Sequence, residues 1–219
     1  MSYSSTVPIM SATVPTLTPA RRPGWPARLL KPGNLLPAAV WTFLVFNQAY
    51  LSPFPPSPST VMLIFIQTVS VALFMLRRDA SLVGGKLDTL IALAGTFSVA
   101  FLKGGNVRDL QLLPTSIQLI ALLGWAWALT SLGRSFGIVP ADRGLVQHGP
   151  YRFVRHPIYA FEALFLLGYL AAVPTWRSAV IILAASALQL LRILREERII
   201  QGYGEYQRRV RWRILPGVW

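Results

Sequence analysis

Six apolar runs separated by polar segments dominate the pattern of the chain. A helix that crosses a bilayer needs about 20 predominantly apolar residues, and the runs nearest to that length are residues 35–51, 60–76, 87–102, 116–132, 158–173 and 179–194. The third and fifth runs are short, and each carries a carboxylate near one end, Asp88 and Glu162. The pattern therefore predicts an all-α, polytopic membrane helix bundle with about six transmembrane helices.

The segments between the runs agree with this division. The stretch SPFPPSPST after the first run cannot continue a helix, because proline lacks a backbone donor and clashes in helix interiors. The stretch VPTW between the last two runs leaves room for a tight turn only, so these runs are expected to form an antiparallel hairpin. We divide the chain into a disordered tail (1–33), a four-helix membrane region (34–133) and a core of loop, hairpin and basic C-terminal segment (134–219).

The composition favours a membrane protein. Of the 219 residues, 53% are hydrophobic and 13% are charged, whereas an average soluble domain has about 25% charged residues. A net charge of +13 is typical of nucleic-acid binding, but the cations fall at the ends of the apolar runs, so no nucleic-acid partner is expected. With no Cys and two His, neither a disulfide framework nor a metal site is expected.

The distribution of cations predicts the topology. All but Lys103, Arg108 and Arg177 of the 21 Lys and Arg residues fall on one side if six runs cross the membrane. Because cytoplasmic loops carry the excess of Lys and Arg, both termini are expected in the cytoplasm. The expected location is the inner membrane of a bacterium or an equivalent internal membrane, as a multi-pass protein in contact with lipids.

Two polar segments, 134–157 and 195–219, would then meet at the cytoplasmic surface, because the hairpin between them brings its two ends together. A helix beginning at Pro157 offers free N–H groups. Together with Arg152, Arg155 and His156 it would attract an anionic group. The alternative interpretation is a basic flank that contacts lipid phosphates.

The acidic and aromatic residues of this region allow two interpretations each. Glu196 and Glu197 would either receive a cationic group, such as an ammonium, or form salt bridges with neighbouring arginines. Glu162, one turn into an apolar run, is a functional candidate, because ionisable residues are costly at membrane depth; the alternative is pairing with an arginine at the interface. The aromatic residues suit an interfacial belt or a pocket wall that favours a cation: Tyr151, Tyr159, Tyr203, Tyr206 and Trp212.

At these residues the chain resembles the isoprenylcysteine carboxyl methyltransferase family and the wider phospholipid methyltransferases. The resemblance covers about residues 134–219. It rests on LVQHGPYRFVRHPIY, on the pair Glu196 and Glu197 after a helical hairpin, and on a Tyr- and Arg-rich tail that ends in Pro216.

The resemblance implies an integral membrane methyltransferase that uses S-adenosylmethionine at a cytoplasmic C-terminal site and acts on a lipophilic acceptor. Such an acceptor is a prenylated or similar carboxylate, or a lipid head group. Arg155, Arg209 and Arg211 would orient an acidic acceptor, and an amine or phenol would need His156 or Glu162 as a proton acceptor. The catalytic candidates are Arg155, His156 and Glu162. The residues implied to hold the cofactor are Gly149, Pro150, Tyr151, Val154, His156, Pro157, Tyr159, Glu196 and Glu197.

Two departures from the family pattern stand out. Phe161 occupies a place where the family often has glycine, and a bulky ring there would narrow the lipid access or alter the acceptor. The segment RIIQG after the glutamates is also shorter than in relatives. Two other function classes stay open: an NADPH-dependent membrane reductase of the sterol-reductase type, and a non-enzymatic transporter or assembly protein.

Overall fold

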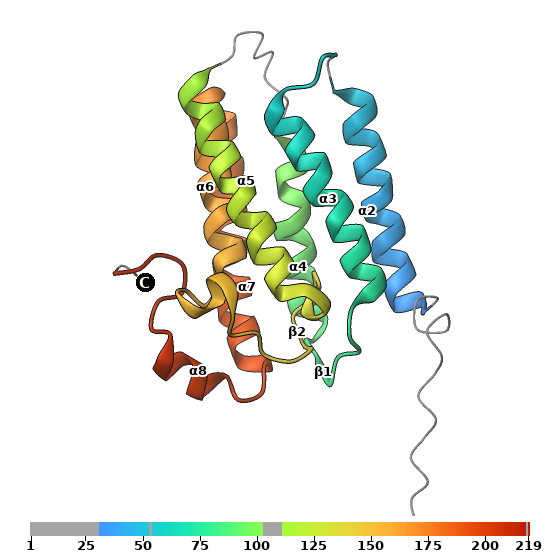
Figure 1. The fold of residues 1–219 in the computed structure, drawn as a ribbon, viewed down its shortest axis with the longest axis vertical. Helices are drawn as coiled ribbons and strands as arrows, with labels where there is room; N and C mark the ends of the chain where they lie inside the picture. The colour runs from blue at the N-terminus through green and yellow to red at the C-terminus, as the bar shows by residue number, and fades with distance from the viewer. Residues whose placement is uncertain (1–30, 53, 103–110, 218) are drawn as a thin grey trace, which may run out of the picture.

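The computed structural model of the protein describes residues 31–52, 54–102, 111–217 and 219, so most of the predicted tail, together with Lys103 and Arg108, lies outside the described residues. In the described part, a helix occupies all or most of each of the six predicted runs, and the helices form one bundle (Figure 1). They are α2 (Pro32–Leu51), α3 (Pro58–Leu76), α4 (Lys86–Ser98), α5 (Leu112–Leu132), α6 (Pro157–Ala172) and α7 (Trp176–Ile199).

Three of these helices, α3, α5 and α7, are long and apolar enough to cross a membrane. The apolar helix α6 is shorter than this, and α4 ends at Ser98 and continues as the 3₁₀ turn η1 (Val99–Phe101). The chain is therefore a mostly helical protein with membrane-type helices, and the count of six spans stays a prediction.

Local signals at the helix starts explain why these elements form where they do. Pro32, Pro58 and Pro157 stand in the first turns of α2, α3 and α6, where the missing N–H costs nothing. Thr175 caps α7 by accepting a hydrogen bond from the backbone N–H of Ser178 at 3.1 Å. The start of α6 at Pro157 agrees with the sequence prediction.

The helices pair unevenly. Helix α6 packs mainly against α5, and α7 mainly against α4, while α2 packs on α3. The contacts between α6 and α7 include a pair of hydrogen bonds from Nε2 of Gln189 to the Glu162 carboxylate, at 3.0 and 2.9 Å. The predicted hairpin is therefore present, and polar side chains bridge its two helices.

Phe161 lies in the close contact between α5 and α6. A Cβ atom added at Gly124 of α5 would lie 2.1 Å from Cε1 of the Phe161 ring, so the ring rests directly on the glycine. The ring that departs from the family pattern thus fills a space between two helices, and it does not line the pocket described below.

The polar end of the bundle contains two short strands that the all-α prediction did not include. Strand β1 (Leu82–Val83) pairs antiparallel with β2 (Ala141–Asp142), and so joins the α3–α4 connection to the segment after α5. Two-residue strands have no hydrophobic period by which a sequence could show them.

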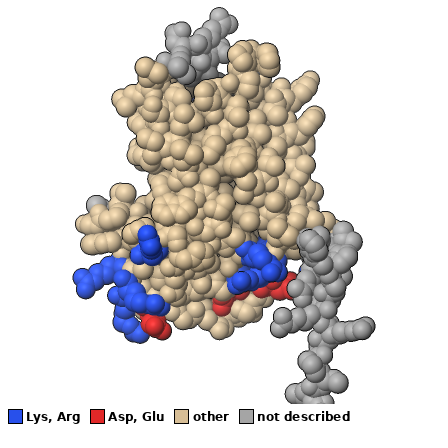
Figure 2. All heavy atoms as spheres, viewed as in Figure 1, with Lys and Arg blue, Asp and Glu red and all other residues tan. Residues whose placement is uncertain are grey.

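The same end holds the 3₁₀ turns η2 (Gly133–Ser135) and η3 (Gly149–Arg152), helix α8 (Tyr203–Arg209) and the C-terminal residues (Figure 1). The described Lys and Arg residues visible in Figure 2 gather there too, away from the apolar body of the bundle. The structure thus places these cationic segments together, as the topology prediction requires.

The contact between Gly124 and Phe161 yields a stability prediction. Gly124→Ala should lower the free energy of unfolding by about 1–3 kcal/mol, because the added methyl group overlaps the ring. In a Phe161→Ala background the same substitution should be far less harmful, since the two residues are in contact. Thermal unfolding in detergent measures both. Gly204→Ala is the control, because nothing lies within 4 Å of a Cβ there; equal effects of Gly124→Ala in both backgrounds would contradict the contact.

Candidate active site

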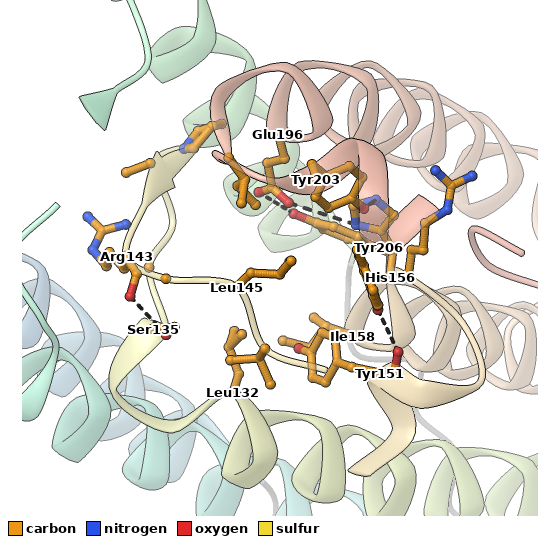
Figure 3. A pocket seen from close by; sticks show the side chains of 18 of the residues that line it. Leu132, Ser135, Arg143, Leu145, Tyr151, His156, Ile158, Glu196, Tyr203 and Tyr206 are labelled. Atoms are coloured by element: carbon orange, nitrogen blue, oxygen red, sulfur yellow. Dashed lines mark hydrogen bonds and ion pairs between the residues drawn. The ribbon is translucent and has the colours of Figure 1, made fainter. Parts of the chain in front are cut away.

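A pocket of about 110 Å³ opens at the polar end of the bundle, between the segment after α5 and the adjoining ends of α6 and α7 (Figure 3). One part of its wall is apolar and comes from Leu132, Leu145, Val146, Ile158 and Ile200. The other part is polar and aromatic, with His156, Glu196 and the tyrosines Tyr151, Tyr159, Tyr203 and Tyr206. A ligand in this pocket would therefore contact both apolar and charged groups.

The two polar segments predicted to converge do so through their backbones. The N–H of Arg155 donates to the carbonyl of Trp212 at 2.9 Å, and the N–H of His156 donates to the carbonyl of Arg213 at 2.8 Å. Nη2 of Arg155 also donates to the carbonyl of Arg211 at 3.2 Å. The start of α6 and the C-terminal segment thus form one unit.

Glu197 lies at the centre of that unit. Its carboxylate is 3.0 Å from Nη1 of Arg155 and 3.1 Å from Nη2 of Arg213, and its side chain is 6% exposed. It also accepts hydrogen bonds from Gln207 at 3.2 Å and Tyr203 at 3.4 Å. Because its oxygens are already engaged and it does not line the pocket, Glu197 acts as an internal counter-charge.

Glu196 has different surroundings, although it directly precedes Glu197 in the chain. Its Oε1 accepts from the Tyr159 hydroxyl at 2.7 Å and from Nε of Arg192 at 3.0 Å, and the Arg192 guanidinium lies 5.4 Å above the Tyr159 ring centroid. Its Oε2 lies 4.0 Å from Nδ1 of His156, beyond hydrogen-bond distance. Glu196 therefore lines the pocket with one fixed oxygen and one that can accept from a ligand.

His156 is oriented by the groups behind it. Its Nε2 is 3.2 Å from Oε1 of Glu197 and 3.0 Å from the Tyr203 hydroxyl. A carboxylate can only accept, so Nε2 carries a proton in this contact, and in the singly protonated form of the ring the lone pair lies at Nδ1. That nitrogen is on the side of Glu196.

Two tyrosines of α8 support the wall of the pocket. The Tyr206 hydroxyl donates to the carbonyl of Tyr151 at 2.5 Å and thereby ties α8 to η3. Burial raises the pKa of both Tyr203 and Tyr206, so both hydroxyls stay protonated and can donate.

Gly149 has a structural reason to be glycine. Its φ is +59°, and a Cβ atom there would lie 2.2 Å from the Ser131 hydroxyl oxygen. Pro150, Val154 and Pro157 are buried next to the pocket residues without lining the pocket. Of the predicted cofactor residues, Tyr151, His156, Tyr159 and Glu196 line it, and the others shape the segment that carries them.

The sequence model of the Isoprenylcysteine carboxyl methyltransferase (ICMT) family matches residues 113–202. Over these residues the match supports the resemblance predicted from the sequence. The match covers less than half of the chain and includes the pocket residues from Leu132 to Ile200, and Tyr203 and Tyr206 follow directly after it. The ICMT family is a family of membrane methyltransferases, which supports methyl transfer as the activity of the chain. A search of the curated proteins found no match.

Three residues predicted for the ICMT-like site lie apart from the pocket. Glu162 is between α6 and α7, where it accepts from Gln189. Arg209 is exposed and lies 3.7 Å from Glu205 on α8, and the side chain of Arg211 is exposed as well. Neither arginine lines the pocket, whereas Arg155 does.

Sequence reasoning missed two arginines of the site. Arg192, which fixes Glu196, looked like one of several cations near the glutamates, and its contacts with Thr96 and Gly137 depend on distant segments. Arg143 lines the pocket but looked like a topology signal. Tyr203 and Tyr206 were among the aromatic residues considered for a pocket wall, and both line the pocket.

The position of Glu197 yields a second prediction. Glu197→Gln should destabilise the protein by on the order of 3 kcal/mol, because it leaves the buried Arg155 without its counter-charge. We expect a lower Tm and faster tryptic cleavage within residues 203–213, both measured on purified protein. Glu205→Gln is the matched control, since Glu205 is exposed and its ion pair is worth little; equal behaviour of the two variants would contradict the assigned role.

Proposed function

We propose that the chain is an integral membrane methyltransferase that transfers a methyl group from S-adenosylmethionine to a lipophilic acceptor. The observation that carries this proposal is the pocket within the ICMT-like region, where Glu196 and His156 face a wall of apolar side chains. A polar cofactor and an apolar acceptor must meet in one place, and this pocket offers both kinds of surface.

The residues present fit such a cofactor. S-adenosylmethionine carries an ammonium, a carboxylate, ribose hydroxyls and an adenine ring. Oε2 of Glu196 can accept from an ammonium or a hydroxyl, and the tyrosine rings offer surfaces for an aromatic or cationic group. Nε of Arg143 is buried in the pocket wall and has no hydrogen-bond partner among the residues that the structure describes. These groups match the polar ends of the cofactor.

When bound, this cofactor supplies a methyl group on a sulfonium, from which the acceptor's lone pair forms the new bond to carbon while the C–S electrons return to sulfur. The chain's own residues hold the reactants in line and exclude water. Leu132 and Ile158, at the ends of α5 and α6, offer an apolar surface to the acceptor. Tyr159 and Arg192 keep the Glu196 carboxylate in place.

The acceptor decides whether a base is needed. A carboxylate acceptor loses no proton, so it needs only positioning by a cation such as Arg155. An amine or phenol must release a proton, and in the singly protonated form of His156 the Nδ1 atom offers a lone pair in the pocket that can take it. Glu162, the other predicted proton acceptor, does not line the pocket. In this proposal the protein lies in a bacterial inner membrane or an equivalent internal membrane. The pocket and both termini are on its cytoplasmic side.

Ligand titration tests the proposed function. We expect S-adenosylhomocysteine, the product, to bind the detergent-purified protein saturably in a calorimeter. A hydrogen bond to a charged group contributes about 1.5–3 kcal/mol. Glu196→Gln should therefore weaken the binding of S-adenosylhomocysteine about 10-fold or more. His156→Ala should also weaken this binding. Glu205→Gln, outside the pocket, should bind like the wild type.

A parallel titration with NADPH separates the alternatives. Binding of NADPH and not of S-adenosylhomocysteine by folded protein would favour the reductase. Binding of neither would rule out the proposed cofactor and favour a non-enzymatic membrane protein.

A further inference from the structure

Among the described residues, Arg143 has no counter-ion, and it lies at the edge of the pocket. It lines the pocket, its buried Nε has no hydrogen-bond partner, and it forms no ion pair within the described part of the chain. The other arginines at the site differ: Arg155 is 3.0 Å from Glu197, and Arg192 is 3.0 Å from Glu196. A partly buried charge without a partner is costly in a folded protein unless a ligand supplies one.

The fold fixes the position of Arg143. Its carbonyl accepts from the Ser135 hydroxyl at 3.1 Å, and its guanidinium lies over Gly137, where an added Cβ would be 2.7 Å from Nη1. The preceding residue, Asp142, accepts from the Ser81 hydroxyl at 3.1 Å and from the N–H groups of Gly144 at 3.0 Å and Gln201 at 3.3 Å. The backbone that carries Arg143 is thereby attached to three segments.

The surroundings of Arg143 favour the binding of an anion. Burial, and then the neighbouring Arg77, lower the pKa of Arg143 to about 10, while Glu196 acts in the opposite direction. In the described structure Glu196 pairs with Arg192 and accepts from Tyr159, and it forms no ion pair with Arg143. At neutral pH Arg143 is therefore still charged, with no carboxylate bound to it.

Arg143 and Glu196 together present opposite charges to one ligand. Both line the same pocket, and Figure 3 shows Arg143 on the side away from His156 and Tyr206, with Glu196 between them. The amino-acid end of the proposed cofactor carries a carboxylate and an ammonium on the same carbon. An unpaired guanidinium and a carboxylate with one free oxygen are complementary to that pair of charges.

We propose that Arg143 binds the carboxylate of the cofactor's amino-acid end, with Glu196 facing the ammonium beside it. This inference rests on the proposed function. A carboxylate of the acceptor is the other source of the same chemistry, and it would not explain why the open oxygen of Glu196 shares the pocket.

The test compares two ligands that differ only in the carboxylate: S-adenosylhomocysteine and its decarboxylated analogue, which keeps the ammonium. Wild-type protein should bind S-adenosylhomocysteine about 10- to 100-fold more tightly, the usual range for a hydrogen bond to a charged group. Arg143→Gln should lose most of that preference by weakening S-adenosylhomocysteine alone. Arg198→Gln, an exposed cation of the same polar end, is the matched control and should keep the preference.

Each result decides the assignment. If Arg143→Gln weakens both ligands equally, the residue only shapes the pocket and the proposal is overturned. If Arg143→Gln binds S-adenosylhomocysteine as tightly as the wild type does, the proposal is overturned too. That result would favour a contact of Arg143 with the acceptor instead. The wild-type comparison holds even if the variant does not fold, since equal affinity for both ligands excludes a carboxylate contact. Failure of the proposed function looks different, because wild type would then bind neither ligand.

Discussion

A buried carboxylate is stable in this protein only because cations from two distant segments surround it. Glu197, at the end of α7, is held between Arg155 at the start of α6 and Arg213 in the C-terminal segment. The same carboxylate accepts from His156 and so fixes the ring that faces the pocket. Because removing either partner would leave a charge in a low-dielectric place, the site and the packing of the C-terminal segment depend on one interaction.

Helix α4 and strand β1, which precede the matched region, also take part in the site. Arg192 reaches from α7 to the hydroxyl of Thr96 on α4, and Arg195 lies 3.4 Å from Asp88 on the same helix. Strand β1 pairs with β2 directly beside Arg143. These contacts give the first helices a role in positioning the polar wall of the pocket, which apolar runs alone could not have indicated.

The sequence predicted much of the fold because its signals were local. Apolar length placed all six helices, and Pro157 marked the start of α6. It did not predict which glutamate would face the pocket. Adjacent residues of a helix point about 100° apart, so one of Glu196 and Glu197 had to face away, and the choice depends on where Arg192 and the C-terminal segment lie. The role of Arg143 was not predicted for a similar reason. A cation in a basic loop becomes a candidate ligand-binding residue only when the structure shows that it lines a pocket without an ion-pair partner.

The uneven packing of the helices explains where the pocket forms. Helices α5 and α6 lie close at Gly124 and Gly168, where an added Cβ would come within 2.1 Å of Phe161 and 2.9 Å of Gln118. Helix α7 instead packs mainly on α4, and polar pairs such as Glu162 with Gln189 bridge it to α6. The pairs α5–α6 and α4–α7 are therefore each closely packed, and the two pairs meet between α6 and α7 through polar side-chain contacts. The pocket lies at the polar end of this α6–α7 contact, where the Tyr159 hydroxyl donates to Glu196. In the proposed function, an apolar acceptor at this place would meet charged groups without crossing the closely packed α5–α6 interface.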